Sequence, residues 1–212
     1  SPDFGRRIRH SEPVSPDRPA PDVMFSFRIA AFICGLGEIG YSKVFLTPEF
    51  GPRQRFAFLL TDAPLEPDPL FEGGICDRCM ACVRECPIGA ISGTETVKVT
   101  VAGRELEWGR LAEWQCFHAY MGSVKETNPF LPLDAFAELP DGDKVLRGEK
   151  ALTPAEVLQV QAILRRYYGN SVGYNSALCG GRGCLRACMV HLEQRGALSR
   201  EFESPFRKRR PW

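Results

Sequence analysis

Four cysteines within eleven residues constrain this chain more than any other feature of its sequence. The stretch reads Cys76-Asp-Arg-Cys79-Met-Ala-Cys82-Val-Arg-Glu-Cys86-Pro87, a C-x2-C-x2-C-x3-C-P spacing. Three cysteines two residues apart place three thiolates on one loop, and the fourth, one helical turn later, faces away from that loop. Zinc sites usually pair two C-x2-C knuckles, and disulfide frameworks belong to small secreted chains. The spacing therefore predicts an iron–sulfur cluster.

A second cysteine group supplies the ligands that this run lacks. In two-cluster bacterial ferredoxins, the fourth cysteine of such a run ligates the other cluster. Downstream lies Cys179-Gly-Gly-Arg-Gly-Cys184-Leu-Arg-Ala-Cys188, and Cys116 stands alone between the two groups. We therefore predict two [4Fe–4S] clusters, the first held by Cys76, Cys79, Cys82 and Cys188, the second by Cys86, Cys116, Cys179 and Cys184. The ninth cysteine, Cys34, is left over.

Composition narrows the class of protein. The chain has 212 residues, of which 44% are hydrophobic, and a net charge of +1. These values indicate a globular chain and give no electrostatic reason to expect nucleic acid or an anionic membrane as a partner. No apolar run has the length of a bilayer span. Thiolate ligands favour a reducing compartment, so we expect a cytoplasmic protein.

The two ends of the chain differ in composition from its middle. Residues 1–22 are rich in Pro, Arg, Asp and Ser, which predicts an extended linker or arm. Because the chain opens with Ser1, it either starts partway into a larger protein or has lost an initiator Met. Residues 201–212 contain the basic run Arg207-Lys-Arg-Arg210, which we interpret as a solvated tail, with nucleic-acid contact as the less favoured alternative.

The remaining patterns predict an α+β fold, namely a bacterial two-[4Fe–4S] ferredoxin-like module with added helices and a short N-terminal α/β segment. We expect this segment, 23–75, to be the edge of an α/β domain, and 76–200 to form the two-cluster domain. The expected helices are 23–34, 111–121, 153–168 and 185–194, and the expected strands are 43–46, 55–61, 96–101 and 105–108, the last two forming a hairpin. We expect residues 128–150 to be a loop with short turns.

Three glycines follow the first expected helix. Gly35, Gly37 and Gly40 match G-x-G-x-x-G letter for letter. A dinucleotide fingerprint would follow a strand inside a βαβ unit, and no such unit fits before Cys76. An elbow that packs closely on its neighbours, or that contacts a ligand, is the better interpretation.

Three further stretches carry a family resemblance. Leu46-Thr-Pro-Glu49-Phe-Gly51-Pro-Arg53, Leu60-Thr-Asp62-Ala-Pro-Leu65-Glu-Pro-Asp68 and Gly89-Ala-Ile91, together with the cysteine run, resemble the C-terminal part of cobalamin-dependent reductive dehalogenases and of epoxyqueuosine reductase. The resemblance supports Cys116 as a ligand of the second cluster. It implies that a preceding nitroreductase-like α/β domain holds a corrinoid to which the clusters pass single electrons. It further implies a corrin-facing elbow, formed by Gly35, Gly37, Glu38 and Gly40, and Tyr41 as a proton donor.

The resemblance has a limit that leaves two functions open. Only 75 residues precede Cys76, too few for a corrinoid domain. We therefore expect the electron-relay part of a corrinoid-type reductase, with a ferredoxin or flavoprotein as electron donor and the corrinoid domain or a catalytic subunit as partner. The alternative is a ferredoxin-like electron carrier without substrate chemistry of its own.

Overall fold

The computed structural model describes residues 26–59, 61–168 and 178–205. The predicted arm 1–22 and the basic run Arg207–Arg210 lie outside these ranges. In chain order the described elements are α2 (Phe27–Ile33), β1 (Glu38–Ile39), β2 (Phe45–Leu46), α3 (Ala81–Arg84), β3 (Ile91–Val101), β4 (Arg104–Leu111), α4 (Glu113–Tyr120), α5 (Gly142–Arg147), α6 (Pro154–Tyr168), α7 (Leu178–Arg182) and α8 (Cys184–Arg195). Helices combined with small antiparallel sheets confirm the α+β class.

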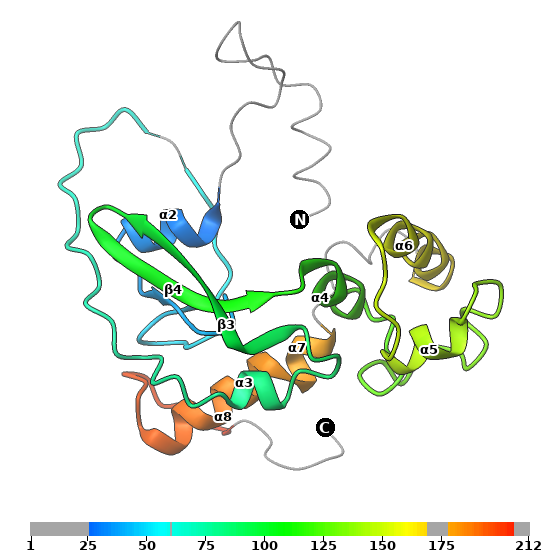
Figure 1. The fold of residues 1–212 in the computed structure, drawn as a ribbon. Helices are drawn as coiled ribbons and strands as arrows, with labels where there is room; N and C mark the ends of the chain where they lie inside the picture. The colour runs from blue at the N-terminus through cyan, green and yellow to red at the C-terminus, as the bar shows by residue number, and fades with distance from the viewer. Residues whose placement is uncertain (1–25, 60, 169–177, 206–212) are drawn as a thin grey trace, which may run out of the picture.

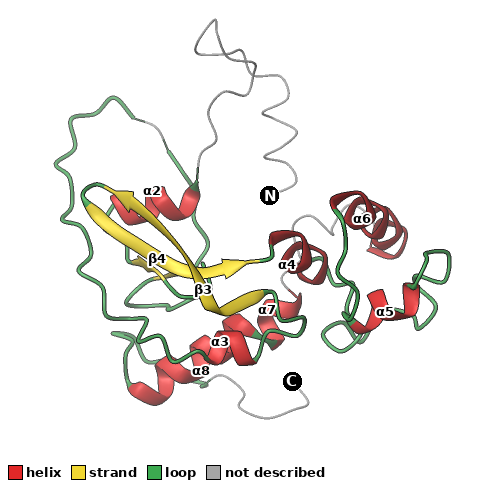
Figure 2. Cartoon of the chain, in the orientation of Figure 1, coloured by secondary structure: helices red, strands yellow, loops and turns green. Residues whose placement is uncertain are grey.

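A long hairpin, β3 and β4, curves over the helices that carry the cysteines (Figure 2). Its turn is Ala102-Gly103, where both residues have positive φ, 49° and 74°, as two-residue hairpin turns require. The predicted pairing of 96–101 with 105–108 is confirmed. Leu106 and Trp108 are buried against α2 and β1, so the hairpin and the N-terminal segment share one hydrophobic cluster.

Three cysteine-bearing helices lie together beneath this hairpin (Figure 1). Helix α8 packs against both α3 and α7, while α3 also contacts β3 and α7 contacts α4. This packing brings segments that are about ninety residues apart in sequence into one layer.

The helical part of the chain has its own core. Thr153 and Glu156 form a capping box at the start of α6, where a helix was expected: the Glu156 carboxylate accepts hydrogen bonds from the Thr153 N–H and hydroxyl, both at 2.8 Å. The stripe that α6 buries consists of Val157, Val160, Ile163 and Leu164, at exposures of 3% or less. Leu131, Phe136 and Val145 cover it. Residues 128–150 contain the turns that were expected, but they also contain helix α5 and are packed into this core, which the expectation of a loop with short turns did not include.

Two other expected elements differ in the structure. The predicted strand 55–61 is absent from the described part of that range, where the chain runs outside any ladder. An alternating pattern alone does not form a strand, because the backbone also needs a neighbouring edge. Helix α2 begins at Phe27, after the cap residue Ser26, and is therefore shorter than the expected helix 23–34. Only Ala31 and Phe32 of this helix are buried.

Among the described residues, no helix combines the length and the apolar character that crossing a bilayer requires.

Candidate metal centre

The first predicted ligand group surrounds one narrow cavity. Its lining contains Cys76, Cys79, Cys82 and Cys188, and no cysteine of the second group. The first two lie on the loop before α3, Cys82 lies in α3, and Cys188 lies in α8. Because α3 packs on α8, the fourth thiol reaches the loop from the far end of the sequence.

The second predicted group comes from four different segments. Cys86 follows α3, Cys116 lies in α4, Cys179 in α7, and Cys184 opens α8. Burial raises the pKa of Cys184 to about 12, and the nearby thiols of Cys86 and Cys116 contribute to the rise. Burial also raises the pKa of Cys179, with contributions from Cys184, Cys116 and Cys86. The four thiols are therefore close enough to act on one another electrostatically.

The chemistry of the two groups fits a cationic cofactor. All nine cysteines are free of disulfide bonds. Burial raises the pKa of Cys82 and of Cys116 to about 11 and that of Cys188 to about 12, with neighbouring thiols adding to each shift. Without a metal, these thiols would stay protonated at neutral pH. A bound metal cluster would stabilise the thiolates and offset the cost of gathering them.

Helix α8 connects the two groups. Cys184 and Cys188 are one turn apart on this helix, and each belongs to a different predicted group. The thiol of Cys184 contributes to the raised pKa of Cys188, and that of Cys82 contributes to the raised pKa of Cys184. The two predicted groups of thiols therefore adjoin at α8.

The loop between the first cysteines has an unusual backbone. Arg78 and Met80 both adopt left-handed conformations, with φ of 56° and 60°. Such angles are uncommon for residues other than glycine and occur often at functional sites. They curl the loop around the first group of thiols. In the sequence, the C-x2-C-x2-C spacing was the only signal that indicated a curled loop here.

Backbone N–H groups point at two of the sulfurs. The Tyr41 N–H donates to Cys76 Sγ at 3.4 Å, and the Ala90 N–H donates to Cys86 Sγ at 3.2 Å. Hydrogen bonds of this kind help to set the potential of iron–sulfur clusters.

The glycine elbow packs against its own chain. A Cβ atom at Gly35 would lie 2.4 Å from the Pro69 carbonyl oxygen, and one at Gly37 would lie 2.0 Å from that of Leu46. At Gly40 the nearest atom would be a side-chain carbon of Leu46, at 3.0 Å. These approaches explain why glycine is needed, and the corrinoid contact of this elbow stays a prediction.

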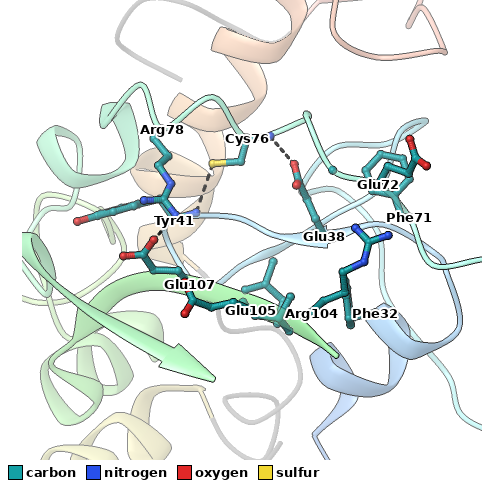
Figure 3. Close-up of a pocket in the computed structure, with 13 residues that line it drawn as sticks. Phe32, Glu38, Tyr41, Phe71, Glu72, Cys76, Arg78, Arg104, Glu105 and Glu107 are labelled. Atoms are coloured by element: carbon teal, nitrogen blue, oxygen red, sulfur yellow. Dashed lines mark hydrogen bonds and ion pairs between the residues drawn. The ribbon is translucent and has the colours of Figure 1, made fainter. Parts of the chain in front are cut away.

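Tyr41 and Glu38 extend from this elbow toward the first group (Figure 3). Tyr41 is buried, and its hydroxyl donates a hydrogen bond to the Ser92 carbonyl at 3.0 Å. Glu38 accepts a hydrogen bond from the Cys76 N–H at 2.5 Å. The proton-donor role of Tyr41 stays a prediction, whereas the contact of Glu38 with the cysteine loop was not foreseen from the sequence.

A charged group lies at the outer side of the first site. Burial opposes ionisation of Asp77, but hydrogen bonds from His191 and Arg195 lower its pKa to about 2. The ligand-capable atoms of Asp77, Cys79 and His191 lie within 4.8 Å of one another. Because Arg195 pairs with Asp77 at 2.6 Å, this carboxylate already has a cationic partner.

His118 lies two residues after Cys116 and is fully buried. The Gln115 side chain donates to the Leu152 carbonyl, which leaves its oxygen to accept from His118 Nε2 at 3.1 Å. Nδ1 then accepts from the Ser123 hydroxyl at 2.6 Å. Burial lowers the pKa of His118 to about 4. Both ring nitrogens of the neutral imidazole are thus hydrogen-bonded to neighbouring side chains.

The chain is similar over part of its length to curated reductases. It is 40% identical over 86 residues to the tetrachloroethene reductive dehalogenase of Sulfurospirillum multivorans, a match that covers 38% of this chain and 16% of that protein. The enzyme of the same name from Desulfitobacterium hafniense is 41% identical over 68 residues, 31% of this chain and 12% of the relative. The epoxyqueuosine reductase of Listeria monocytogenes is 34% identical over 59 residues, 28% of this chain and 15% of the relative. No family model and no solved structure matches the chain.

Proposed function

We propose that this chain, a relative of reductive dehalogenases and epoxyqueuosine reductase over about a third of its length, relays single electrons through two [4Fe–4S] clusters to a corrinoid-type reductive site. One observation carries the proposal. Cys76, Cys79, Cys82 and Cys188, from segments distant in sequence, line one cavity. Cys184, one turn from Cys188 on α8, lies near Cys86 and Cys116, whose thiols contribute to its raised pKa. A purely structural role would be met by one such site, whereas two neighbouring sites suit transfer between them.

The two sets of ligands define the relay. Cys76, Cys79, Cys82 and Cys188 would hold the first cluster, and Cys86, Cys116, Cys179 and Cys184 the second. When bound, the clusters supply one-electron chemistry at low potential, because thiolate ligation and burial away from water favour the oxidised state. Helix α8 would join the two sets, because it carries Cys184 of one and Cys188 of the other, and Cys82 and Cys179 are buried.

The partners of this relay follow from the resemblance. A ferredoxin or flavoprotein would deliver electrons, and a nitroreductase-like α/β domain or a separate catalytic subunit would hold the corrinoid. The elbow Gly35–Tyr41 would face that corrinoid, with Gly35, Gly37, Glu38 and Gly40 in contact with it and Tyr41 as proton donor. Each matched relative is much longer than the matched segment, which spans 16% of its length or less, so most of the relative's machinery lies outside the matched region.

A redox titration of anaerobically purified protein, followed by electron paramagnetic resonance, tests the relay. We expect two clusters that each accept one electron at about −400 mV or lower, the range of low-potential ferredoxins. Clusters that resist reduction, or that titrate several hundred millivolts higher, would contradict the proposed relay to a corrinoid.

Cobalt content separates the relay from a ferredoxin-like carrier. The protein would be produced with cobalamin in the medium and with any sequence that precedes residue 1 in its native polypeptide. Corrinoid absorbance and stoichiometric cobalt in that protein support the corrinoid reductase. Clusters without cobalt in the same protein would favour the simple carrier.

A further inference from the structure

The backbone that enters the first cysteine group is held from two sides. On one side, Glu38 Oε1 accepts a hydrogen bond from the Cys76 N–H at 2.5 Å, and Oε2 accepts one from the Gly74 N–H at 3.3 Å. On the other side, Arg195 Nη2 donates to the carbonyl oxygens of Gly74 and Ile75, at 3.2 and 2.8 Å. The Glu38 carboxylate thus accepts hydrogen bonds from the N–H groups of this segment, and the Arg195 guanidinium donates hydrogen bonds to its carbonyls.

The local structure is shaped for the Glu38 contact. Glu38 lies in β1, where it pairs with Leu46 of β2, so its backbone is fixed. Gly73 and Gly74 have φ of 96° and 99°, which side chains other than glycine's rarely permit. A Cβ atom at Gly73 would lie 3.0 Å from Glu38 Oε2. The carboxylate therefore fits closely against this turn.

Glu38 also borders a cavity of about 190 Å³ that reaches Cys76 (Figure 3). The other carboxylates that line this cavity do not bind the cysteine loop in this way. Glu107 pairs with Arg78, and Glu105 pairs with Lys98. Glu72 is exposed and lines the same cavity, but its carboxylate makes no hydrogen bond to the cysteine loop. Glu38 is thus the lining carboxylate whose oxygen is bonded to the N–H of a predicted ligand.

We propose that Glu38 is a positioning residue for the first cluster, which fastens the backbone of Gly74 and Cys76 and lowers the reduction potential of that cluster through its negative charge. The inference rests on the proposed function, because it requires that the cluster be present. Reduction adds one electron to the cluster, and a nearby carboxylate disfavours this added negative charge. The hydrogen bond from the Cys76 N–H to Glu38 also keeps this N–H from donating to a cluster sulfur. Such a donation would raise the reduction potential of the cluster.

The test compares two isosteric variants in the full chain. Glu38→Gln removes the charge and one of the two acceptor oxygens, while Glu72→Gln removes a charge from the same cavity without touching the loop. Both proteins would be purified anaerobically, assayed for iron, and titrated with dithionite under electron paramagnetic resonance. We expect Glu38→Gln to shift the potential of one cluster upward and leave the other unchanged, and Glu72→Gln to behave as the unmodified chain does.

Each outcome of this experiment has one meaning. Loss of one cluster in Glu38→Gln, with both retained in Glu72→Gln, also supports the positioning role, and Glu38→Asp is then expected to restore iron at an unshifted potential. Full iron content with unchanged potentials in Glu38→Gln overturns the inference and leaves the relay intact. An unmodified chain without clusters overturns the proposed function itself.

Discussion

At the scale of single residues, cysteine spacing carried most of the information about the candidate site. One cavity is lined by Cys76, Cys79, Cys82 and Cys188 and by no cysteine of the second predicted set, whereas Cys34 is exposed at the end of α2. The assignment of the thiols to two clusters stays a prediction. Glu38 and Arg195 were not foreseen, because their contacts with the loop cross 38 and 120 positions of sequence. No local pattern predicts a carboxylate that binds a backbone N–H so far along the chain.

Replacing Cys116 tests the assignment of the second set. Cys116→Ala should remove one of its four thiols and so reduce the iron content from about eight to about four per chain, with the spectrum of one cluster lost. Cys34→Ala is the matched control and should keep all of the iron. Retention of full iron and unchanged spectra in Cys116→Ala would refute the ligand assignment.

At the scale of elements, predictions succeeded where local chemistry determines the structure. The hairpin turn needs two residues with positive φ, and the capping box closes within four residues, so both can be identified from sequence. The expected strand 55–61 is absent from the described residues of that range, because pairing depends on a distant edge. Helix α5 was missed because it has six residues and gains its stability from packing rather than from local propensity.

The core of α6 gives a stability prediction. Leu164 is fully buried against the segment 128–150, so Leu164→Ala should lower the free energy of unfolding by about 2–5 kcal/mol through lost burial and a residual cavity. Leu158, on the same helix, is 58% exposed, so Leu158→Ala should change the free energy of unfolding by less than about 0.5 kcal/mol. Chemical unfolding followed by circular dichroism measures both, and equal effects would contradict the packing described for α6.

The capping box gives a pH prediction. The Thr153 N–H, Lys150 and the Thr153 hydroxyl lower the pKa of Glu156 from 4.5 to about 2. A carboxylate with a lowered pKa stabilises the fold above its unfolded value of 4.5, and this contribution is lost as pH falls through about 2. Amide hydrogen exchange in the first turn of α6 should therefore be faster in Glu156→Gln than in the unmodified chain at pH 7 and still at pH 4. A difference that disappears by pH 4 would indicate an unshifted carboxylate.

At the scale of the whole molecule, the α+β class and the resemblance to reductive dehalogenases and epoxyqueuosine reductase were predictable from the sequence, and both are confirmed. The division at residues 22, 75 and 200 stays a prediction, as does the ferredoxin-like module. The hairpin shares one hydrophobic cluster with the segment before the cysteines, because Trp108 and Leu106 pack on Phe32 and Ile39. Sequence alone could not predict this packing, because the two segments are far apart in the chain and neither contains a local pattern that identifies the other as its partner.

The most direct test of the account is the iron and acid-labile sulfide content of the 212-residue chain, purified without oxygen, together with its intact mass. Two [4Fe–4S] clusters predict about eight irons and about eight sulfides per chain. About four of each would mean that only one set of thiols holds a cluster. Zinc in place of iron, or no bound metal after anaerobic purification, would contradict the assignment of these cysteines as iron–sulfur ligands.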